Sequence, residues 1–427
     1  MGTEIYLKVG PAMLDWSKNS RGDDHGVLFQ ERDRTHRLSD QTNYAYCKEH
    51  GIDAEPRERT LVRTLKSIVP RLDLLGFTVD TARSEYEKIA AECADYQDEE
   101  SSSPPPLPFS EFLAFLSRHP LGTLDDKFIE GFDEESTRRM QGRFASDPAL
   151  GRIPTWDGSG DGYSEASYFA SLIRILHPYS VMRLLALVPE NLQADVTWHY
   201  GAMVDSGWAG EEEFSACARR EQTFLIATEG TSDIHILRHA LSLLMPDIED
   251  FFRFIDVSER HPFSGTGSLV NFAEGLAKID VQNQVVFLFD NDSEGWAAFE
   301  KVQGLTLPQN MSAMVLPDIE DFRAFPGIGP HGVLPSDINR RAAGIECYLD
   351  LRLEGRPSAQ VLWTNYKKDR NDYQGSLEHK ESYMRAFLEQ RPHAIVSGTY
   401  DVSKLRLVLD RLFQECSAIA AQAQSRS

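Results

Sequence analysis

Three carboxylates follow two short apolar segments in the middle of the chain. Glu229 comes directly after Phe224–Thr228, and Asp290 and Asp292 come after Val285–Phe289. Apolar runs of this length, bounded by charge and glycine, are typical of strands buried on both faces of a parallel sheet. Ligands bind to such sheets at the carboxyl ends of the strands. If the two strands are neighbours, the three carboxylates converge at one edge.

A carboxylate cluster of this kind favours a divalent metal ion. Like charges repel one another at short range unless a cation lies among them, and oxygen ligands are those that Mg²⁺ and Mn²⁺ prefer. Asp233 lies about one turn into the helix that we expect at Thr231–Leu244, so it can approach the same metal as Glu229. Acidic residues also occur at helix starts for purely structural reasons. The prediction of a metal site therefore depends on the set rather than on any one acid.

The same segments resemble a known family. An apolar strand that ends in Glu-Gly, followed by a helix and an apolar strand that ends in Asp-x-Asp, is similar to a TOPRIM domain. The Glu-Gly-x-x-Asp form at Glu229–Asp233 resembles the OLD-type nuclease branch of that family. The Ile-Glu-x-Tyr-Leu segment at Ile345–Leu349 resembles the OLD-type motif that supplies a further acid, here Glu346. Lys380 lies where these nucleases tend to carry a lysine.

The resemblance implies both a site and a chemistry. Two metal ions about 4 Å apart can polarise a phosphoryl oxygen, generate hydroxide and stabilise the leaving oxygen. We expect one metal at Asp290 and Asp292 with Glu229 between them, and the second at Asp233 and Glu346, with Glu346 in a helix. The implied metal ligands are Glu229, Asp233, Asp290, Asp292 and Glu346. The implied catalytic residues are Glu229, Asp290, Asp292 and Lys380, of which the lysine would stabilise charge on the transition-state phosphate.

These residues predict an Mg²⁺- or Mn²⁺-dependent endonuclease that hydrolyses phosphodiester bonds of DNA, with RNA as the alternative substrate. The family resemblance implies an effector of bacterial defence against phage or plasmids. Two other interpretations stay open. One is a TOPRIM nucleotidyl transferase of the primase type, although no zinc-binding pattern accompanies it. The other is a non-catalytic TOPRIM subunit that docks into a larger complex.

The charge of the chain limits how it can hold a nucleic acid. The 427 residues carry a formal net charge of −22, whereas proteins that grip nucleic acid over a wide surface are usually basic. Contact with DNA would therefore use a local basic patch, a bound metal or a partner. The chain has no Gly-Lys dipeptide and hence no P-loop. We expect an ATP-driven step to need a separate ATPase or sensor protein, and we expect a homo-oligomer or a larger complex.

Cysteine usage and hydropathy predict a cytoplasmic protein. The five cysteines are widely spaced and form no Cys-x-x-Cys pair, so neither a zinc site nor a disulfide framework is indicated. A reducing compartment suits this pattern. No signal peptide is evident at the start, and the chain has no apolar run of the roughly 18 residues that a membrane span needs. We therefore expect no contact with a membrane.

Composition divides this α/β chain into five regions. We expect a small α/β accessory domain at residues 1–96, a Ser/Pro-rich linker at 97–108 and a mainly helical region at 109–210. Residues 221–395 form the TOPRIM catalytic domain, which the resemblance makes a Rossmann-like, mostly parallel sheet with helices on both faces. Residues 396–427 form a C-terminal helix and tail.

The first and third regions also carry local predictions. Hydrophobic patterning predicts strands at Glu4–Val9 and Gly26–Phe29, an amphipathic helix at Arg57–Leu75 and a helix at Ala194–Gly207. The opening Met1–Gly10 segment resembles an N-terminal domain found in bacteria ahead of TOPRIM or HEPN effector domains. That resemblance implies an accessory or sensing role.

Overall fold

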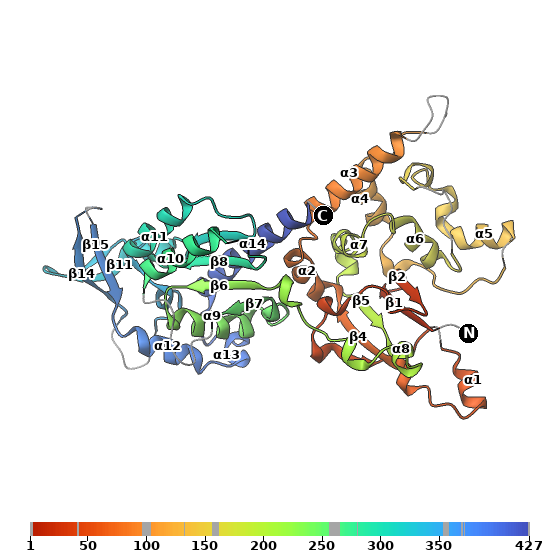
Figure 1. Cartoon of the computed structure of the whole chain (residues 1–427), viewed down its shortest axis with the longest axis horizontal. Helices are drawn as coiled ribbons and strands as arrows, with labels where there is room; N and C mark the ends of the chain where they lie inside the picture. The colour runs from red at the N-terminus through yellow and green to blue at the C-terminus, as the bar shows by residue number, and fades with distance from the viewer. Residues whose placement is uncertain are drawn as a thin grey trace. The chain divides into compact units, whose positions relative to one another are not determined.

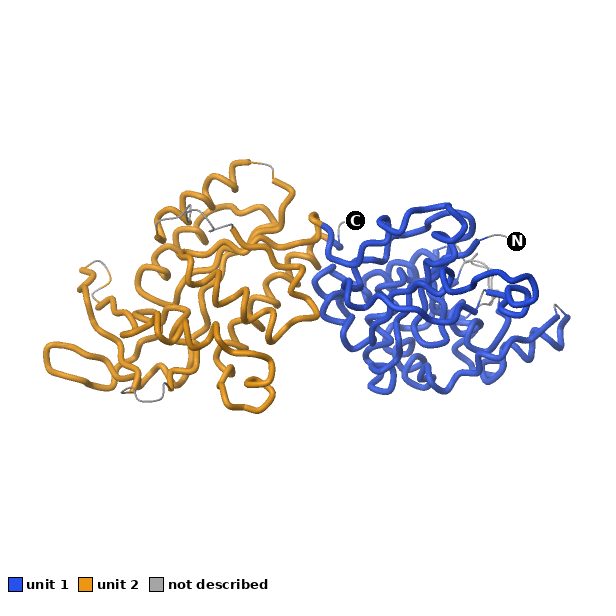
Figure 2. The backbone as a smooth tube through the Cα atoms, turned by 90° about the horizontal axis from the view of Figure 1, so that it is seen from below, with its two compact units in different colours: residues 1–219, 424–427 blue, residues 220–423 orange. Residues whose placement is uncertain are grey.

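The computed structural model describes residues 3–40, 42–95, 104–131, 133–155, 162–255, 265–279, 281–352, 358–368, 370 and 372–425. The chain forms two compact units (Figures 1 and 2). Unit 1 comprises residues 1–219 and 424–427, and unit 2 comprises residues 220–423. Each unit combines sheets with helices, so the predicted α/β fold class is confirmed. Residues 97–103 of the predicted linker lie outside the described residues.

Unit 1 is built on a five-stranded antiparallel sheet. The strands lie in the order β2-β1-β5-β4-β3. Their bounds are β1 Glu4–Val9, β2 Ala12–Lys18, β3 Arg34–His36, β4 Arg59–Thr64 and β5 Asp195–His199. Strand β5 pairs antiparallel with β1 on one side and with β4 on the other. Residues from both ends of unit 1 therefore complete one sheet, and the segments 1–96 and 109–210 contribute to the same unit.

The position of β5 overturns the helix predicted at Ala194–Gly207. This segment contains β5 and only a short helix, α8, at Gly201–Asp205. Val196, Thr197 and Trp198 are β-branched or aromatic residues, which favour strands. Val196 and Trp198 are also almost completely buried, because β5 is the central strand of the sheet. Pairing with β1 and β4 therefore makes this segment a strand, although the spacing of its apolar residues predicts a helix.

Two further local predictions in unit 1 are wrong. The predicted strand at Gly26–Phe29 is a 3-10 helix at Gly26–Leu28. The helix predicted at Arg57–Leu75 is instead β4 followed by α2 at Leu65–Leu74. Strand β4 pairs with β3 and β5, so the first part of this amphipathic pattern belongs to a strand that is paired on both sides.

The helices of unit 1 pack around an aromatic core. They are α1 Tyr44–Glu49, α2, α3 Val79–Asp95, α4 Phe109–Arg118, α5 Glu134–Gln141, α6 Glu165–Ile173, α7 Pro178–Leu185 and α8. Phe115 of α4 and Phe169 of α6 lie with ring centroids 5.9 Å apart, and Phe144 stacks on Phe169 at 5.5 Å. All three are fully buried. This core lies in the region that the sequence predicted to be mainly helical.

Unit 2 contains a four-stranded parallel sheet in the order β10-β8-β6-β7. The strands are β6 Phe224–Thr228, β7 Phe252–Phe254, β8 Gln284–Phe289 and β10 Met311–Val315. The connecting helices are α9 Thr231–Leu244, α10 Thr266–Ala277 and α11 Ser293–Gln303. Figure 1 shows α10 and α11 on one face of the sheet and α9 on the other. Strands β6 and β8 are direct neighbours, with Thr228 opposite Leu288.

A second sheet and three more helices complete unit 2. The sheet has the order β12-β11-β14-β15, with β11 at Phe325–Gly329, β12 at Gly332–Ser336, β14 at Val361–Lys367 and β15 at Asp372–Leu377. A short ladder joins β9 Asn291–Asp292 to β13 Ala342–Ala343. The helices are α12 Lys380–Leu388, α13 Pro392–Val396 and α14 Ser403–Gln424. In the described part of the chain, no helix combines the length and the apolar character needed to cross a membrane.

The buried His199 of β5 predicts a loss of stability in acid. Its side chain is 7% exposed, and its Nδ1 atom has no hydrogen-bond partner. Burial, and then the charge of Lys8, lower the pKa of His199 to about 4. An unfolded histidine titrates near pH 6.5, so the unfolded state takes up the proton first. The contribution of the neutral His199 to the free energy of unfolding is therefore fully present above about pH 6.5, and it is lost as the pH falls toward about 4.

Replacing this histidine should reduce the fall in the free energy of unfolding at acidic pH. We expect His199→Phe to retain about 2 kcal/mol more of its neutral-pH stability than the wild type does at about pH 4.5. Urea unfolding across this pH range measures the difference. His36→Phe, at an exposed position of β3, is the matched control. Parallel profiles for wild type and His199→Phe would contradict the prediction.

Candidate functional site

The carboxyl edge of the parallel sheet carries the acids of the two central strands. Glu229 follows β6, and Asp290 follows β8. Because the two strands are parallel neighbours, these residues lie side by side, and the backbone N–H of Asp290 donates to Glu229 Oε1 at 3.2 Å. Asp292 is the N-cap of α11, and Asp233 lies in the first turn of α9. The four acids, which lie just before or at the start of α9 and α11, are therefore all at the carboxyl edge of the parallel sheet.

Glu346 reaches this edge through a strand pairing that the sequence does not reveal. Ala342 of β13 pairs antiparallel with Asp292, and the chain then turns so that the Ile345 N–H donates to Asp290 Oδ1 at 3.2 Å. Glu346 is 7% exposed. It lies in a 3-10 helix at Ile345–Tyr348, and the predicted helix there is therefore shorter and tighter than expected. The pairing of β13 with β9 leaves no room for a longer helix before it.

Two of the carboxylates meet beside Gly344. A Cβ atom at this position would lie 3.3 Å from Glu346 Oε2 and 3.5 Å from Asp290 Oδ2. These two oxygens therefore flank one small space that glycine leaves open. Among the described residues, Asp290 Oδ2 accepts no hydrogen bond, so it is oriented toward this space without a neutralising partner.

Burial, together with the charges of neighbouring acids, raises the pKa values of the clustered acids. Burial, and then the charge of Asp292, raise the pKa of Glu229 to about 8. Burial, and then the charge of Glu346, raise the pKa of Asp233 to about 7. The pKa of Asp290 is raised well above its usual range by burial and by the charges of Asp233 and Glu229. Burial also raises the pKa of Asp292. The set therefore behaves as one strongly coupled anionic cluster.

Two polar side chains outside the acid set contact it. Lys380, the first residue of α12, places its Nζ 3.8 Å from Glu346 Oε1, and its side chain is 52% exposed. Its charge opposes the rise in the pKa of Asp233. Gln374 of β15 donates to Asp292 Oδ2 at 2.5 Å. The sequence carries no signal for Gln374, because its place depends on how the second sheet packs.

The chemistry of this donor set fits a hard divalent cation. Carboxylate oxygens are the ligands that Mg²⁺ and Mn²⁺ prefer. Within the described residues, however, no group of three or more His, Cys, Asp or Glu side chains is arranged so that it could hold a metal ion directly. Metal binding would therefore require the carboxylates to rotate toward a common point. The roles predicted for Glu229, Asp233, Asp290, Asp292, Glu346 and Lys380 stay predictions.

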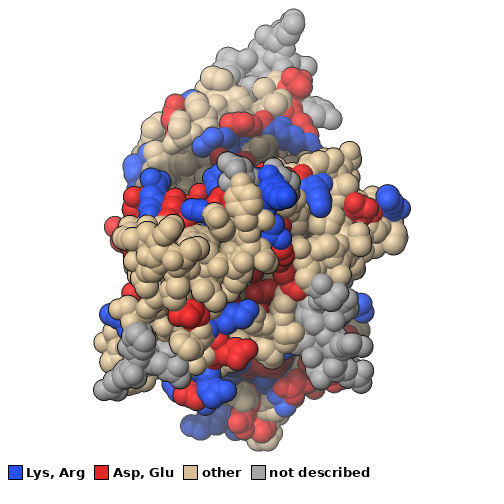
Figure 3. Space-filling view, turned by 90° about the vertical axis from the view of Figure 1, so that its left-hand side faces the viewer, with Lys and Arg blue, Asp and Glu red and all other residues tan. Residues whose placement is uncertain are grey.

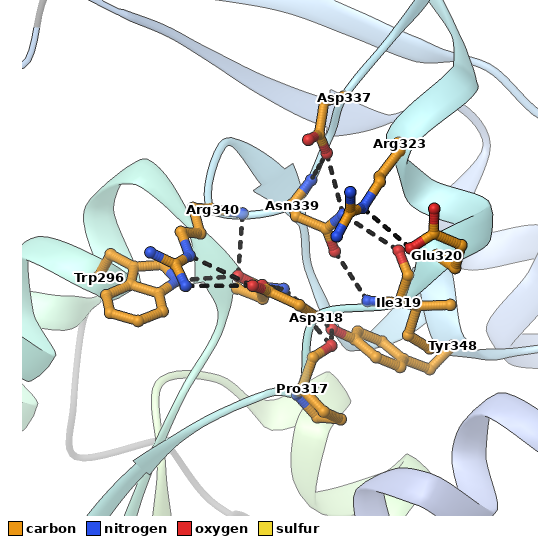
Figure 4. Close-up of polar contacts among 11 residues, drawn as sticks. Trp296, Pro317, Asp318, Ile319, Glu320, Arg323, Asp337, Asn339, Arg340 and Tyr348 are labelled. Atoms are coloured by element: carbon orange, nitrogen blue, oxygen red, sulfur yellow. Dashed lines mark hydrogen bonds and ion pairs between the residues drawn. The ribbon is translucent and has the colours of Figure 1, made fainter.

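The central residue of the Asp-x-Asp segment organises the neighbouring loops. Asn291 is fully buried. Its Oδ1 accepts hydrogen bonds from Trp296 Nε1 at 2.8 Å and from the Arg340 N–H at 2.9 Å. Its Nδ2 donates to Asp318 Oδ1 at 3.0 Å. Figure 4 shows Trp296, Asp318 and Arg340 gathered around this point. The sequence reading passed over Asn291, although a polar residue between two acids at a strand end could have indicated it.

Basic residues at the end of β14 and just after it pair with acids of α11. Lys367 Nζ lies 2.5 Å from Glu294 Oε1, and Arg370 pairs with Glu300. Figure 3, which faces the side of unit 2 that carries β14 and β15, shows Lys and Arg side chains interspersed with Asp and Glu. Among the described residues drawn there, basic and acidic side chains are mixed, in keeping with the acidic composition of the whole chain.

Repulsion within the acid cluster predicts the behaviour of the metal-free protein. The pKa of folded Glu229, about 8, lies above its ordinary value of 4.5. The folded state therefore holds this proton more tightly, and stability present at about pH 4 is lost as the pH rises toward about 8. In chelator-treated protein, we expect Glu229→Gln to be more stable than the wild type by about 1–3 kcal/mol at about pH 8.

Urea unfolding at about pH 5 and about pH 8 measures this difference, and the two proteins should be nearly equal at the lower pH. Glu320→Gln, whose side chain is 80% exposed in the same unit, is the control for loss of one negative charge. A Glu229→Gln protein that is less stable than the wild type at the higher pH would show that repulsion does not dominate.

The comparisons with known proteins concern unit 1. The family model described as HEPN/Toprim N-terminal domain 1 matches residues 1–222 of the 427-residue chain. Searches of curated proteins and of solved structures gave no match. The match includes all five strands of the unit 1 sheet, and it confirms the predicted N-terminal domain of the kind found ahead of HEPN or Toprim effectors. Because the model matches more than half of its length, the chain belongs to the HEPN/Toprim N-terminal domain 1 family.

Proposed function

We propose that unit 2 is a TOPRIM domain of the OLD-type nuclease branch and that the protein is an Mg²⁺- or Mn²⁺-dependent endonuclease acting on DNA. One observation carries the proposal. Three separate segments of the sequence bring Glu229 and Asp233, Asp290 and Asp292, and Glu346 to one sheet edge, where burial and the charges of neighbouring acids raise the pKa of several of them. Crowding carboxylates in this way costs free energy of folding, and a bound cation would offset that cost.

The residues around the cluster can support phosphodiester hydrolysis. The five acids would hold the metal, which when bound would polarise a phosphoryl oxygen and acidify a water molecule. The Gly295 N–H donates to Asp292 Oδ1 at 2.7 Å, and Gln374 holds the other oxygen of that carboxylate. Lys380 is half exposed beside Glu346, so its ammonium can donate to a phosphate oxygen and offset the charge that develops in the transition state.

The family membership supports a role as an effector in bacterial defence. Unit 1 would then be the accessory or sensing part, and unit 2 the part that cuts. The acidic chain has no P-loop, and the described residues on the face shown in Figure 3 mix basic with acidic side chains. We therefore include in the proposal a cytoplasmic homo-oligomer, or a complex with a separate ATPase or sensor protein. RNA is the alternative substrate of the same site.

A second candidate function is a non-catalytic subunit that docks into a larger complex. It is favoured by one specific observation: among the residues that the structure describes, no three acids are already arranged around a metal position. The two functions differ in whether the acid cluster binds Mg²⁺ or Mn²⁺ at all, and this difference can be measured directly.

Isothermal calorimetry with Mg²⁺ and Mn²⁺ separates the two candidates. We expect the wild type to bind both ions and Glu346→Gln to bind them at least about tenfold more weakly, because one ligand loses its charge. Binding should also raise the melting temperature of the wild type. Glu320→Gln, an exposed acid of the same unit, should behave as the wild type does. A wild type that takes up neither ion would favour the docking subunit.

Plasmid cleavage tests the reaction. With Mg²⁺ or Mn²⁺ we expect nicking by the wild type and a loss of at least about a hundredfold in Asp290→Ala, since this side chain lies at the centre of the acid cluster. Lys380→Met should lower kcat by about a hundredfold with little change in melting temperature, because the lysine is half exposed. Cleavage that survives Asp290→Ala would place the chemistry elsewhere.

A further inference from the structure

Arg340 adopts a backbone conformation that few non-glycine residues take. Its φ angle is 60°, in the left-handed region. Its N–H donates to Asn291 Oδ1, which fixes the backbone directly behind the Asp-x-Asp segment. The next residue, Arg341, forms a β-bridge with Asp292. Arg340 is therefore held at the border of the acid cluster by contacts that its own backbone makes.

The guanidinium group is positioned by two neighbours. It lies 4.3 Å from the centre of the Trp296 ring, and its Nε and Nη2 donate to Asp318 Oδ2 at 3.3 Å and 3.2 Å (Figure 4). Trp296 is itself fixed by its hydrogen bond to Asn291 Oδ1. One buried amide oxygen thus positions both the backbone of the arginine and the ring beneath its side chain.

Fold stability does not account for this arrangement. The side chains of Arg340 and Asp318 are 58% and 47% exposed, and ion pairs so exposed contribute little to stability. A positive φ at a non-glycine residue costs stability. Arg340 Nη1 makes no hydrogen bond to any residue in the described part of the chain. A stacked, planar guanidinium with an open donor edge is suited to a phosphate group.

We propose that Arg340 binds a backbone phosphate of the nucleic acid next to the phosphate at the acid cluster, and so positions the strand for cleavage. The inference rests on the proposed function, since it concerns the same substrate. The acid cluster repels a phosphate at short range, so a strand needs a fixed cation beside it. Asn291 lies between Asp290 and Asp292 and holds Arg340, which gives this cation a set position relative to the acids.

Binding is measured apart from cleavage. Fluorescence anisotropy with a labelled DNA duplex, the same sequence as a single strand and its RNA counterpart, all with Ca²⁺ in place of Mg²⁺, gives Kd as a function of salt. We expect Arg340→Asn to raise Kd about tenfold and to lower the salt slope by about one, because one phosphate contact is lost. Asparagine tolerates a positive φ better than most residues, so this variant should fold.

Two further variants make the test specific. Arg340→Lys keeps the charge but loses the planar, stacked donor edge, so its Kd should lie between those of the wild type and Arg340→Asn. Arg323→Gln is the matched control, because Arg323 is also an exposed arginine paired with an acid, Glu320, at 3.0 Å in the same unit. It should bind as the wild type does.

The outcomes separate this inference from the proposed function. If the wild type binds none of the three nucleic acids, both the role of Arg340 and the nuclease proposal are contradicted. Binding by the wild type with an unchanged salt slope in Arg340→Asn overturns the role of Arg340 and leaves the nuclease proposal standing. A Kd that rises only together with a fall in melting temperature shows a structural role and also overturns the inference.

Discussion

Electrostatic repulsion at the carboxyl edge of the β10-β8-β6-β7 sheet is the constraint on which unit 2 depends. The adjacent strands β6 and β8 bring Glu229 and Asp290 into contact. Asp233 and Glu346 are almost completely buried beside them. Burial, and then the charges of neighbouring acids, raise the pKa values of Glu229 and Asp233. Crowded carboxylates of this kind repel one another, and the proposed metal ion would offset that repulsion.

The rest of unit 2 is arranged to hold this edge in place. The β9–β13 ladder places Ala343 opposite Asn291 and leads the chain to Glu346. The second sheet supplies Gln374, which holds Asp292, and α12 begins at Lys380 beside Glu346. Residues that follow the parallel sheet in sequence therefore complete a site whose first acids lie more than a hundred residues earlier. The site cannot form in a fragment that ends after β10.

Unit 1 also depends on pairing between segments that lie far apart in the sequence. The central strand of its sheet is β5, which follows α7 in the sequence and lies between β1 and β4, two strands from the first 64 residues. The family match spans residues 1–222, a longer segment than the small N-terminal domain that the sequence predicted at residues 1–96. The buried His199 lies in this central strand, which makes the unit sensitive to acid.

The sequence by itself determined the parallel sheet, its helices and the acids at the ends of β6 and β8, because an apolar run that stops at an acid is a local pattern. It did not determine β5, the β11–β12 hairpin or the 3-10 helix of Glu346. Nor did it indicate Asn291, Gln374 and Arg340. Each of these depends on a partner far away in the chain, and only the tertiary structure brings those partners together.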